Sequence, residues 1–157
     1  MSLEDDIAFL EAVPTLALLG RPALRILAIG AETRKIPSGA VLYYAGDLAD
    51  AGYLVQEGSF LLEPDRPGKG DEVIAEPGTL LGELALVTDT VHTATATAQE
   101  SSIVIRITRT LFLKMLEGYP EAARKLRDGM AQRVAEWGRD ISAVKEKLEA
   151  GLKDETS

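Results

Sequence analysis

The chain has 157 residues, of which 46% are hydrophobic and 27% charged, and its formal net charge is −8; these values are typical of one folded domain and exclude a largely disordered chain. It contains no cysteine and a single histidine, which excludes disulfides, thiolate metal sites and multi-histidine metal cages. The acidic charge disfavours direct contact with nucleic acid, and the sequence has neither an apolar run of about 20 residues nor a basic N-terminal signal, so we expect a cytoplasmic protein that does not bind membranes.

Apolar residues recur at helical spacing in the first 30 residues. They follow one another at intervals of three at Ile7, Leu10, Val13, Leu16 and Leu19, which is typical of a helix with one buried face. Pro14 and the Gly20-Arg21-Pro22 segment interrupt this pattern, because proline is favoured at the start of a helix and disfavoured inside it. The sequence therefore predicts short helices over residues 1–30.

Residues 31–108 have a sequence pattern typical of short strands. Turn signals such as Pro37-Ser38-Gly39, Ala45-Gly46-Asp47 and Glu57-Gly58-Ser59 recur about every ten residues. They separate runs rich in β-branched and apolar residues: Val41–Tyr44, Tyr53–Gln56, Phe60–Leu62, Glu72–Ala75, Thr93–Ala98 and Ser102–Ile107. Strands this short and this evenly spaced predict an antiparallel sandwich or barrel, and the lack of intervening helices disfavours a parallel sheet.

The helical period returns after Thr108. This threonine is a good N-cap for a helix over Arg109–Glu117, which Gly118 would end, and Pro120 would begin a second helix extending to about Leu148. We therefore expect a single domain over residues 1–157. It would have N-terminal helices over 1–30, a β region over 31–108 and two C-terminal helices over 109–150.

One segment, residues 80–96, has the properties of an anion-binding site. It contains Gly82-Glu83-Leu84-Ala85 after a Pro-Gly turn and His92-Thr93-Ala94 before a strand. A glycine allows close approach of the backbone to a ligand, and the short helical turn after it would point free N–H groups at a negative group. A carboxylate at Glu83 suits a ligand hydroxyl that needs an acceptor.

This segment resembles the phosphate-binding cassette of the cyclic-nucleotide-binding domain family, found in catabolite-activator-type regulators and kinase regulatory subunits. The family pattern is Gly-Glu-x-Ala/Gly, a variable stretch, and Arg-Ser/Ala/Thr-Ala. The resemblance extends to the turns listed above and to Pro120, where the last family helix begins. It implies a mainly β fold with flanking helices, an eight-stranded double-stranded β-helix of the jelly-roll or cupin-like type.

The resemblance also assigns a role to each matching position. Gly82 would make the turn, Glu83 would bind the ribose 2′-hydroxyl, and the amides of Leu84 and Ala85 would face the cyclic phosphate. Thr93 stands where the family has Ser, Ala or Thr, and a hydroxyl there resembles sites that contact phosphate and favour guanine. Ala94 would allow the next strand to pack closely. The implied ligand is cAMP or cGMP, with no further cofactor and no metal.

His92 stands where the family has its phosphate-pairing arginine. The charged guanidinium of arginine can donate hydrogen bonds to two phosphate oxygens at once. An unperturbed histidine titrates at about pH 6.5 and is mostly neutral at pH 7. A charged hydrogen bond contributes about 1.5–3 kcal/mol, so its loss would weaken a cyclic nucleotide roughly 10- to 150-fold. A bound phosphate would in turn favour the protonated imidazole.

The last predicted helix carries a second signal. Its apolar residues are spaced 4, 3, 4, 3 and 4 apart, as in the seam of a coiled coil: Met130, Val134, Trp137, Ile141, Val144 and Leu148. The equivalent family helix often forms a parallel dimer and caps the base. We expect a homodimer through this seam with Trp137 as its anchor; the alternative is a helix packed on its own β region.

Three functions stay open from the sequence. The first is a stand-alone regulatory module that binds cAMP or cGMP with modest affinity. The second is a degenerate dimeric interaction module without nucleotide, and the third is a sensor of another small anion. No helix-turn-helix or effector sequence follows the last helix, so we expect signalling through an unidentified partner protein or through dimer geometry. A single histidine and the lack of a Gly-x-Ser-x-Gly motif disfavour an enzyme.

Overall fold

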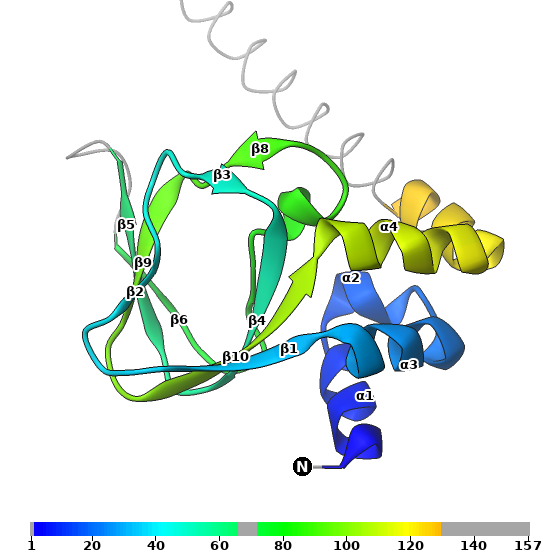
Figure 1. Ribbon diagram of the computed structural model, residues 1–157, viewed down its shortest axis with the longest axis horizontal. Coiled ribbons are helices and arrows are strands. Elements are labelled where there is room, and N and C mark those ends of the chain that lie inside the picture. Colours follow the sequence, from blue (N-terminus) through cyan, green and yellow to red (C-terminus); the bar gives the residue numbers. More distant parts are fainter. Residues whose placement is uncertain (1, 66–71, 130–157) are drawn as a thin grey trace, which may run out of the picture.

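The computed structural model describes residues 2–65 and 72–129 and shows a β-roll flanked on one side by helices (Figure 1). Helices α1 (Leu3–Glu11), α2 (Pro14–Ala17) and α3 (Arg21–Gly30) precede the roll, and α4 (Arg109–Gly118) follows it. Residues 120–129 are also helical. The helix beyond residue 129 and the seam predicted from Met130 to Leu148 lie outside the described residues.

The N-terminal helices begin where local chemistry favours it. Ser2 caps α1 in a reciprocal capping box with Asp5, in which each side chain accepts a hydrogen bond from the backbone N–H of the other. Pro14 is the first residue of α2, and α3 begins after Gly20, which has a φ of 86°. The predicted interruptions at Pro14 and Gly20-Arg21-Pro22 are confirmed.

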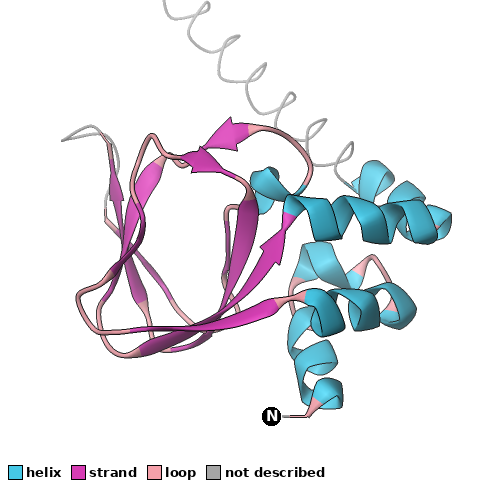
Figure 2. Ribbon diagram, viewed as in Figure 1, coloured by secondary structure: helices cyan, strands magenta, loops and turns pink. Residues whose placement is uncertain are grey.

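The strands form two antiparallel four-stranded sheets (Figure 2). One has the order β1-β10-β4-β7 and the other β2-β9-β5-β6, and a short pair, β3-β8, lies apart. The bounds are β1 Glu32–Ile36, β2 Val41–Tyr43, β3 Leu48–Ala49, β4 Ala51–Glu57, β5 Phe60–Pro64, β6 Val73–Ala75, β7 Leu80–Leu81, β8 Thr90–Val91, β9 Ala94–Ala98 and β10 Ser102–Thr108. The predicted mainly β roll with flanking helices is confirmed.

The expected number of strands was too small. The family resemblance implies eight strands, whereas the described residues contain ten. Strands β3, β7 and β8 have only two residues each, so they leave no alternating pattern in the sequence. They form because partners distant in sequence lie beside them, as Leu48 pairs with Val91 and Leu81 with Tyr53.

Two hydrophobic cores share the strands β4 and β10. Leu54 of β4 faces the helices, whereas its neighbours Tyr53 and Val55 face the interior of the roll. Strand β10 alternates in the same way, with Ile105 and Ile107 toward the helices. Each fully buried side chain of this size contributes about 1.5–3 kcal/mol by leaving water. The β4-β10 sheet thus joins the helices to the roll.

Candidate functional site

The predicted cassette folds as a tight turn and one short helix. Strand β7 leads into Gly82, whose backbone is left-handed (φ 72°, ψ 34°), and a 3-10 helix, η1, follows over Glu83–Leu86. A Cβ on residue 82 would lie 3.1 Å from the carbonyl oxygen of Ala51 and 3.5 Å from Cε1 of His92. Both the conformation and the crowding therefore favour glycine here.

Hydrogen bonds within the cassette use part of its backbone. The N–H of Ala85 donates to the carbonyl of Gly82 at 3.0 Å, and the N–H groups of Val87 and Thr88 both donate to the carbonyl of Leu84 at 3.2 Å. The side chain of Ala85 is fully buried, whereas that of Leu84 is exposed. An anion that approached η1 would share the N–H of Ala85 with the turn.

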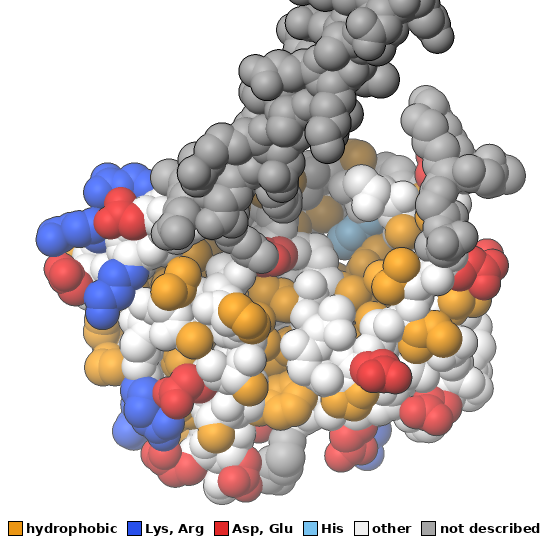
Figure 3. Space-filling model, turned by 180° about the vertical axis from the view of Figure 1, so that it is seen from behind, with side chains coloured by type: hydrophobic (Ala, Val, Ile, Leu, Met, Phe, Trp, Pro, Cys, Tyr) orange, Lys and Arg blue, Asp and Glu red, His pale blue; other side chains and the backbone are white. Residues whose placement is uncertain are grey.

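A pocket of about 420 Å³ opens beside η1. All seven predicted site residues line it: Gly82, Glu83, Leu84, Ala85, His92, Thr93 and Ala94. Strands β2, β5, β7 and β8 contribute further lining residues, so the pocket lies between the cassette and the roll. Figure 3 shows the face that carries the histidine, which lies among hydrophobic side chains. The structure therefore brings the two halves of the motif together, while their roles in binding stay predictions.

The carboxylate of Glu83 is placed by the N-terminal helices. The hydroxyl of Thr15, which is buried on α2, donates a hydrogen bond to Oε1 of Glu83. The two residues are 68 positions apart in sequence, and no motif marks Thr15, so the sequence did not predict this contact. It links the cassette to α2, and a ligand hydroxyl that approached this oxygen would compete with Thr15.

His92 is a buried side chain with a fixed orientation. It is 8% exposed, and its ring stacks on Tyr43 with the centroids 3.6 Å apart and the planes 9° from parallel. Its backbone N–H donates to the carbonyl of Asp47 at 2.9 Å, and its carbonyl accepts from Gly46 at 2.7 Å. Burial lowers the pKa of His92 below its usual value, with the carboxylates of Asp47 and Asp50 opposing that effect. At neutral pH the imidazole is therefore mainly uncharged.

This lowered pKa predicts a pH dependence of stability. In the unfolded chain the histidine takes up a proton at about pH 6.5, whereas in the folded chain it does so only at lower pH. Because the unfolded chain then binds more protons, the folded state loses stability as the pH falls below neutral toward the pKa of the folded chain. We expect wild type to lose more stability than His92→Gln between about pH 7.5 and about pH 5.5. Urea unfolding of both proteins measures this; parallel losses would contradict the assignment.

Burial also raises the pKa of Tyr43, to about 12, and its phenol is protonated at neutral pH. The ring of Tyr43 lies 5.9 Å from that of Tyr53. The stack with His92 therefore extends into the interior of the roll, where Tyr53 belongs to the core. The tyrosines were not predicted as site residues, because their β-branched and aromatic surroundings indicate only a strand.

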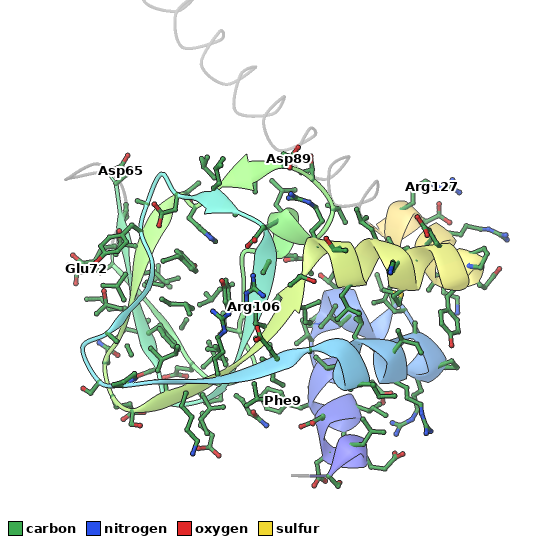
Figure 4. All side chains as sticks on the ribbon, viewed as in Figure 1. Phe9, Asp65, Glu72, Asp89, Arg106 and Arg127 are labelled. Atoms are coloured by element: carbon green, nitrogen blue, oxygen red, sulfur yellow. The ribbon has the colours of Figure 1, made fainter. Side chains whose placement is uncertain are left out.

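A further residue that the sequence did not predict, Arg109, holds the end of the cassette. It is the first residue of α4, and its Nη1 donates to the carbonyls of Ala49 (3.2 Å), Ala85 (3.4 Å) and Thr88 (2.9 Å). Its Nη2 lies 2.7 Å from Oδ1 of Asp89, which is labelled in Figure 4. Arg109 therefore joins η1 and the loop after it to the start of α4.

Replacing Arg109 with methionine is expected to lower the free energy of unfolding by about 1–3 kcal/mol, because three carbonyls lose a charged donor while the aliphatic stem is kept. Asp89→Asn is the matched control. Asp89 is 95% exposed, so its ion pair contributes less than about 1 kcal/mol. Urea unfolding compares the two variants, and equal small losses would mean that the guanidinium does not hold the cassette.

Comparison with known proteins decides the family. The family model for the cyclic nucleotide-binding domain matches residues 33–119, more than half of the chain. This chain belongs to the cyclic nucleotide-binding domain family. The match runs from β1 through α4 and includes the whole cassette. The family is one of regulatory domains, and among the described residues no group of three or more His, Cys, Asp or Glu side chains could hold a metal ion.

Individual relatives agree with this assignment. The chain is 31% identical over 107 residues to the cyclic AMP receptor protein of Thermus thermophilus and 32% identical over 125 residues to the lysophospholipase nte1 of Neurospora crassa. These matches cover 67% and 78% of this chain, but 50% and 8% of those proteins. The solved structure of a cyclic nucleotide-binding-like protein from Brucella abortus is 33% identical, with a TM-score of 0.65 over 72% of this chain and 98% of that one.

Within residues 2–65 and 72–129, no helix is both long enough and apolar enough to cross a lipid bilayer.

Proposed function

We propose that this chain is a cytoplasmic regulatory module that binds a nucleotide-type ligand with modest affinity, cAMP and cGMP being the first candidates, and that it acts by binding and not by catalysis. One observation carries the proposal. The left-handed turn at Gly82 and the helix η1 put Glu83 on the wall of a pocket of about 420 Å³, which His92, Thr93 and Ala94 also line. The family assignment supports a ligand of this class.

In this proposal Glu83 accepts a hydrogen bond from the ribose 2′-hydroxyl, and the amides of Leu84 and Ala85 face the phosphate. Thr93, which is exposed at the pocket, offers its hydroxyl to the ligand, and Ala94 leaves room at the start of β9. His92 lowers the expected affinity, because a buried neutral imidazole forms a weaker interaction with a phosphate than a charged guanidinium does. Modest affinity for cyclic nucleotides follows.

Contacts of the cassette suggest how occupancy would be transmitted. Leu86 of η1 belongs to the same core as Phe112 of α4, Arg109 joins η1 to the start of α4, and Thr15 joins Glu83 to α2. A ligand that shifts η1 would therefore act on the helices on both sides. We propose that the signal passes on through a homodimer formed by the seam from Met130 to Leu148, or through a protein partner.

The test is a calorimetric titration of the full chain with cAMP and cGMP. If either binds, Glu83→Ala is expected to weaken it by more than about 1 kcal/mol, because the ligand hydroxyl loses a charged acceptor. Glu117→Ala is the matched control, since Glu117 is an exposed carboxylate on α4, outside the pocket lining. Unchanged affinity in Glu83→Ala would place the ligand elsewhere.

A second function is favoured by a specific pair of contacts. Glu83 is bonded to Thr15, and His92 is stacked on Tyr43, so two of the three polar side chains of the motif already have protein contacts. A degenerate module that only mediates protein interactions would have such a filled site. We would conclude that the chain is such a degenerate module if neither cyclic nucleotides nor nucleosides bind at millimolar concentration, which corresponds to a binding free energy of about −4 kcal/mol.

A further inference from the structure

The lining of the pocket is apolar, hydroxylic and acidic. Leu62, Leu80, Leu81 and Val91 supply aliphatic walls, and Thr79 and Thr90 supply hydroxyls. Among the described lining residues, Glu83 is the one acidic side chain, and none is a lysine or an arginine. A phosphate would therefore enter beside a carboxylate and find no full positive charge on these walls to replace its hydration, which is costly for an anion.

The charges behind the lining do not reverse this balance. The carboxylates of Asp47 and Asp50 lie near enough to His92 to act on its protonation. Asp50 is paired with Nη2 of Arg106 at 3.5 Å, while Asp47 accepts a hydrogen bond from a backbone amide at 3.1 Å.

The guanidinium of Arg109, which contacts the cassette, already has partners within the protein. It contacts Asp89 and the carbonyls of Ala49, Ala85 and Thr88, and Arg109 is not among the residues that line the pocket.

The stack of His92 on Tyr43 makes a different kind of surface. The two rings are nearly parallel with their centroids 3.6 Å apart, and backbone hydrogen bonds to Gly46 and Asp47 hold His92 in place. Such a neutral aromatic pair, next to aliphatic walls, suits an uncharged planar ring. Glu83 also lines the pocket, and its carboxylate suits a pair of neighbouring hydroxyls, because it has two acceptor oxygens, one of which a ligand would share with Thr15.

We propose that the pocket recognises an uncharged, diol-bearing ring compound of the nucleoside type, and that it gives no preference to the corresponding cyclic phosphate. This inference rests on the proposed function and names the ligand class of the same site. The phosphate of a cyclic nucleotide loses its hydration beside Glu83 and gains only amides and a neutral imidazole. The nucleoside makes the same ring and hydroxyl contacts without that cost.

The experiment is a calorimetric titration of the full chain with adenosine and cAMP, and in parallel with guanosine and cGMP, at about pH 7.5. For wild type we expect the nucleoside of the preferred base to bind at least as tightly as its cyclic phosphate. His92→Arg is expected to shift the ratio of the two affinities toward the cyclic phosphate by at least about tenfold. The 2′-deoxynucleoside is expected to bind more weakly than the nucleoside, because Glu83 loses one hydroxyl partner.

A matched control separates the local effect from net charge. Ile74→Arg adds the same single charge at an exposed position of β6 that does not line the pocket, and it is expected to leave the ratio unchanged within about twofold. Tenfold tighter binding of the cyclic phosphate to wild type would overturn this inference while leaving the proposed function intact. An unchanged ratio in His92→Arg would overturn it as well. Binding of neither class would overturn both.

Discussion

Replacing Phe112 with alanine is expected to lower the free energy of unfolding by about 3–5 kcal/mol, the usual cost of removing a buried aromatic ring. Phe112 is 1% exposed and belongs to the core that joins α1, α3 and α4 to one face of β4 and β10. The same core contains Leu86 of η1. Its loss would therefore loosen both the helical side of the domain and the support of the cassette.

Urea unfolding followed by circular dichroism measures this effect. Leu113→Ala is the control on the same helix, because Leu113 is 40% exposed and its truncation is expected to cost less than about 1 kcal/mol. Phe112→Leu should lie between the two. A loss in Phe112→Ala as small as that in Leu113→Ala would contradict the placement of α4 on this core.

Gly58→Ala is expected to lower the free energy of unfolding by about 2–5 kcal/mol, through a left-handed backbone and steric overlap together. Gly58 has a φ of +83°, and a Cβ there would lie 2.7 Å from Cβ and 2.8 Å from the backbone Cα of Ser102. Ser102 is fully buried and its hydroxyl donates to the carbonyl of Glu100 at 2.8 Å. The clash therefore falls on a residue that is held in place.

Gly39→Ala separates the two causes. Gly39 has a similar φ of +85°, but a Cβ there would meet nothing within 4 Å, so its substitution carries the backbone cost alone, about 1–2 kcal/mol. The difference between the two variants, measured by urea unfolding, gives the steric part. Equal losses would mean that the β4-β5 turn can shift away from Ser102.

Much of the fold follows from the sequence because its local signals are strong. The interruptions at Pro14 and Pro22 and the cap at Thr108 depend on backbone chemistry that any context preserves, and the structure has the helices that they predict. The runs before and after Glu57-Gly58-Ser59 became β4 and β5. Alternation on β4 and β10 is hidden, however, because both faces of these strands are buried in different cores.

Other elements depend on contacts that no short pattern encodes. Strand β1 reads Glu-Thr-Arg-Lys-Ile and is exposed at four of its five residues, so its composition resembles a loop. It becomes a strand because its whole length pairs with β10. The two-residue strands β3 and β8 likewise exist only as a pair.

The site shows the same division. The spacing of Gly82-Glu83 and His92-Thr93 indicated a cassette, and the structure gathers these residues at one pocket. The sequence also showed that His92 stands in place of arginine. It did not show that His92 is buried against Tyr43, that Thr15 reaches Glu83, or that Arg109 holds η1. Each of these contacts joins residues more than 20 positions apart, so only the fold determines them.

The most direct test of a ligand-binding cassette is two-dimensional NMR of the isotope-labelled full chain during a titration with adenosine and, separately, with cAMP. Saturable shifts of backbone amides are expected first at Gly82–Ala85 and His92–Ala94, the residues that line the pocket. Smaller shifts are expected at the start of α4, because Arg109 contacts η1. No saturable shift with either compound, or shifts confined to residues away from the pocket, would contradict it.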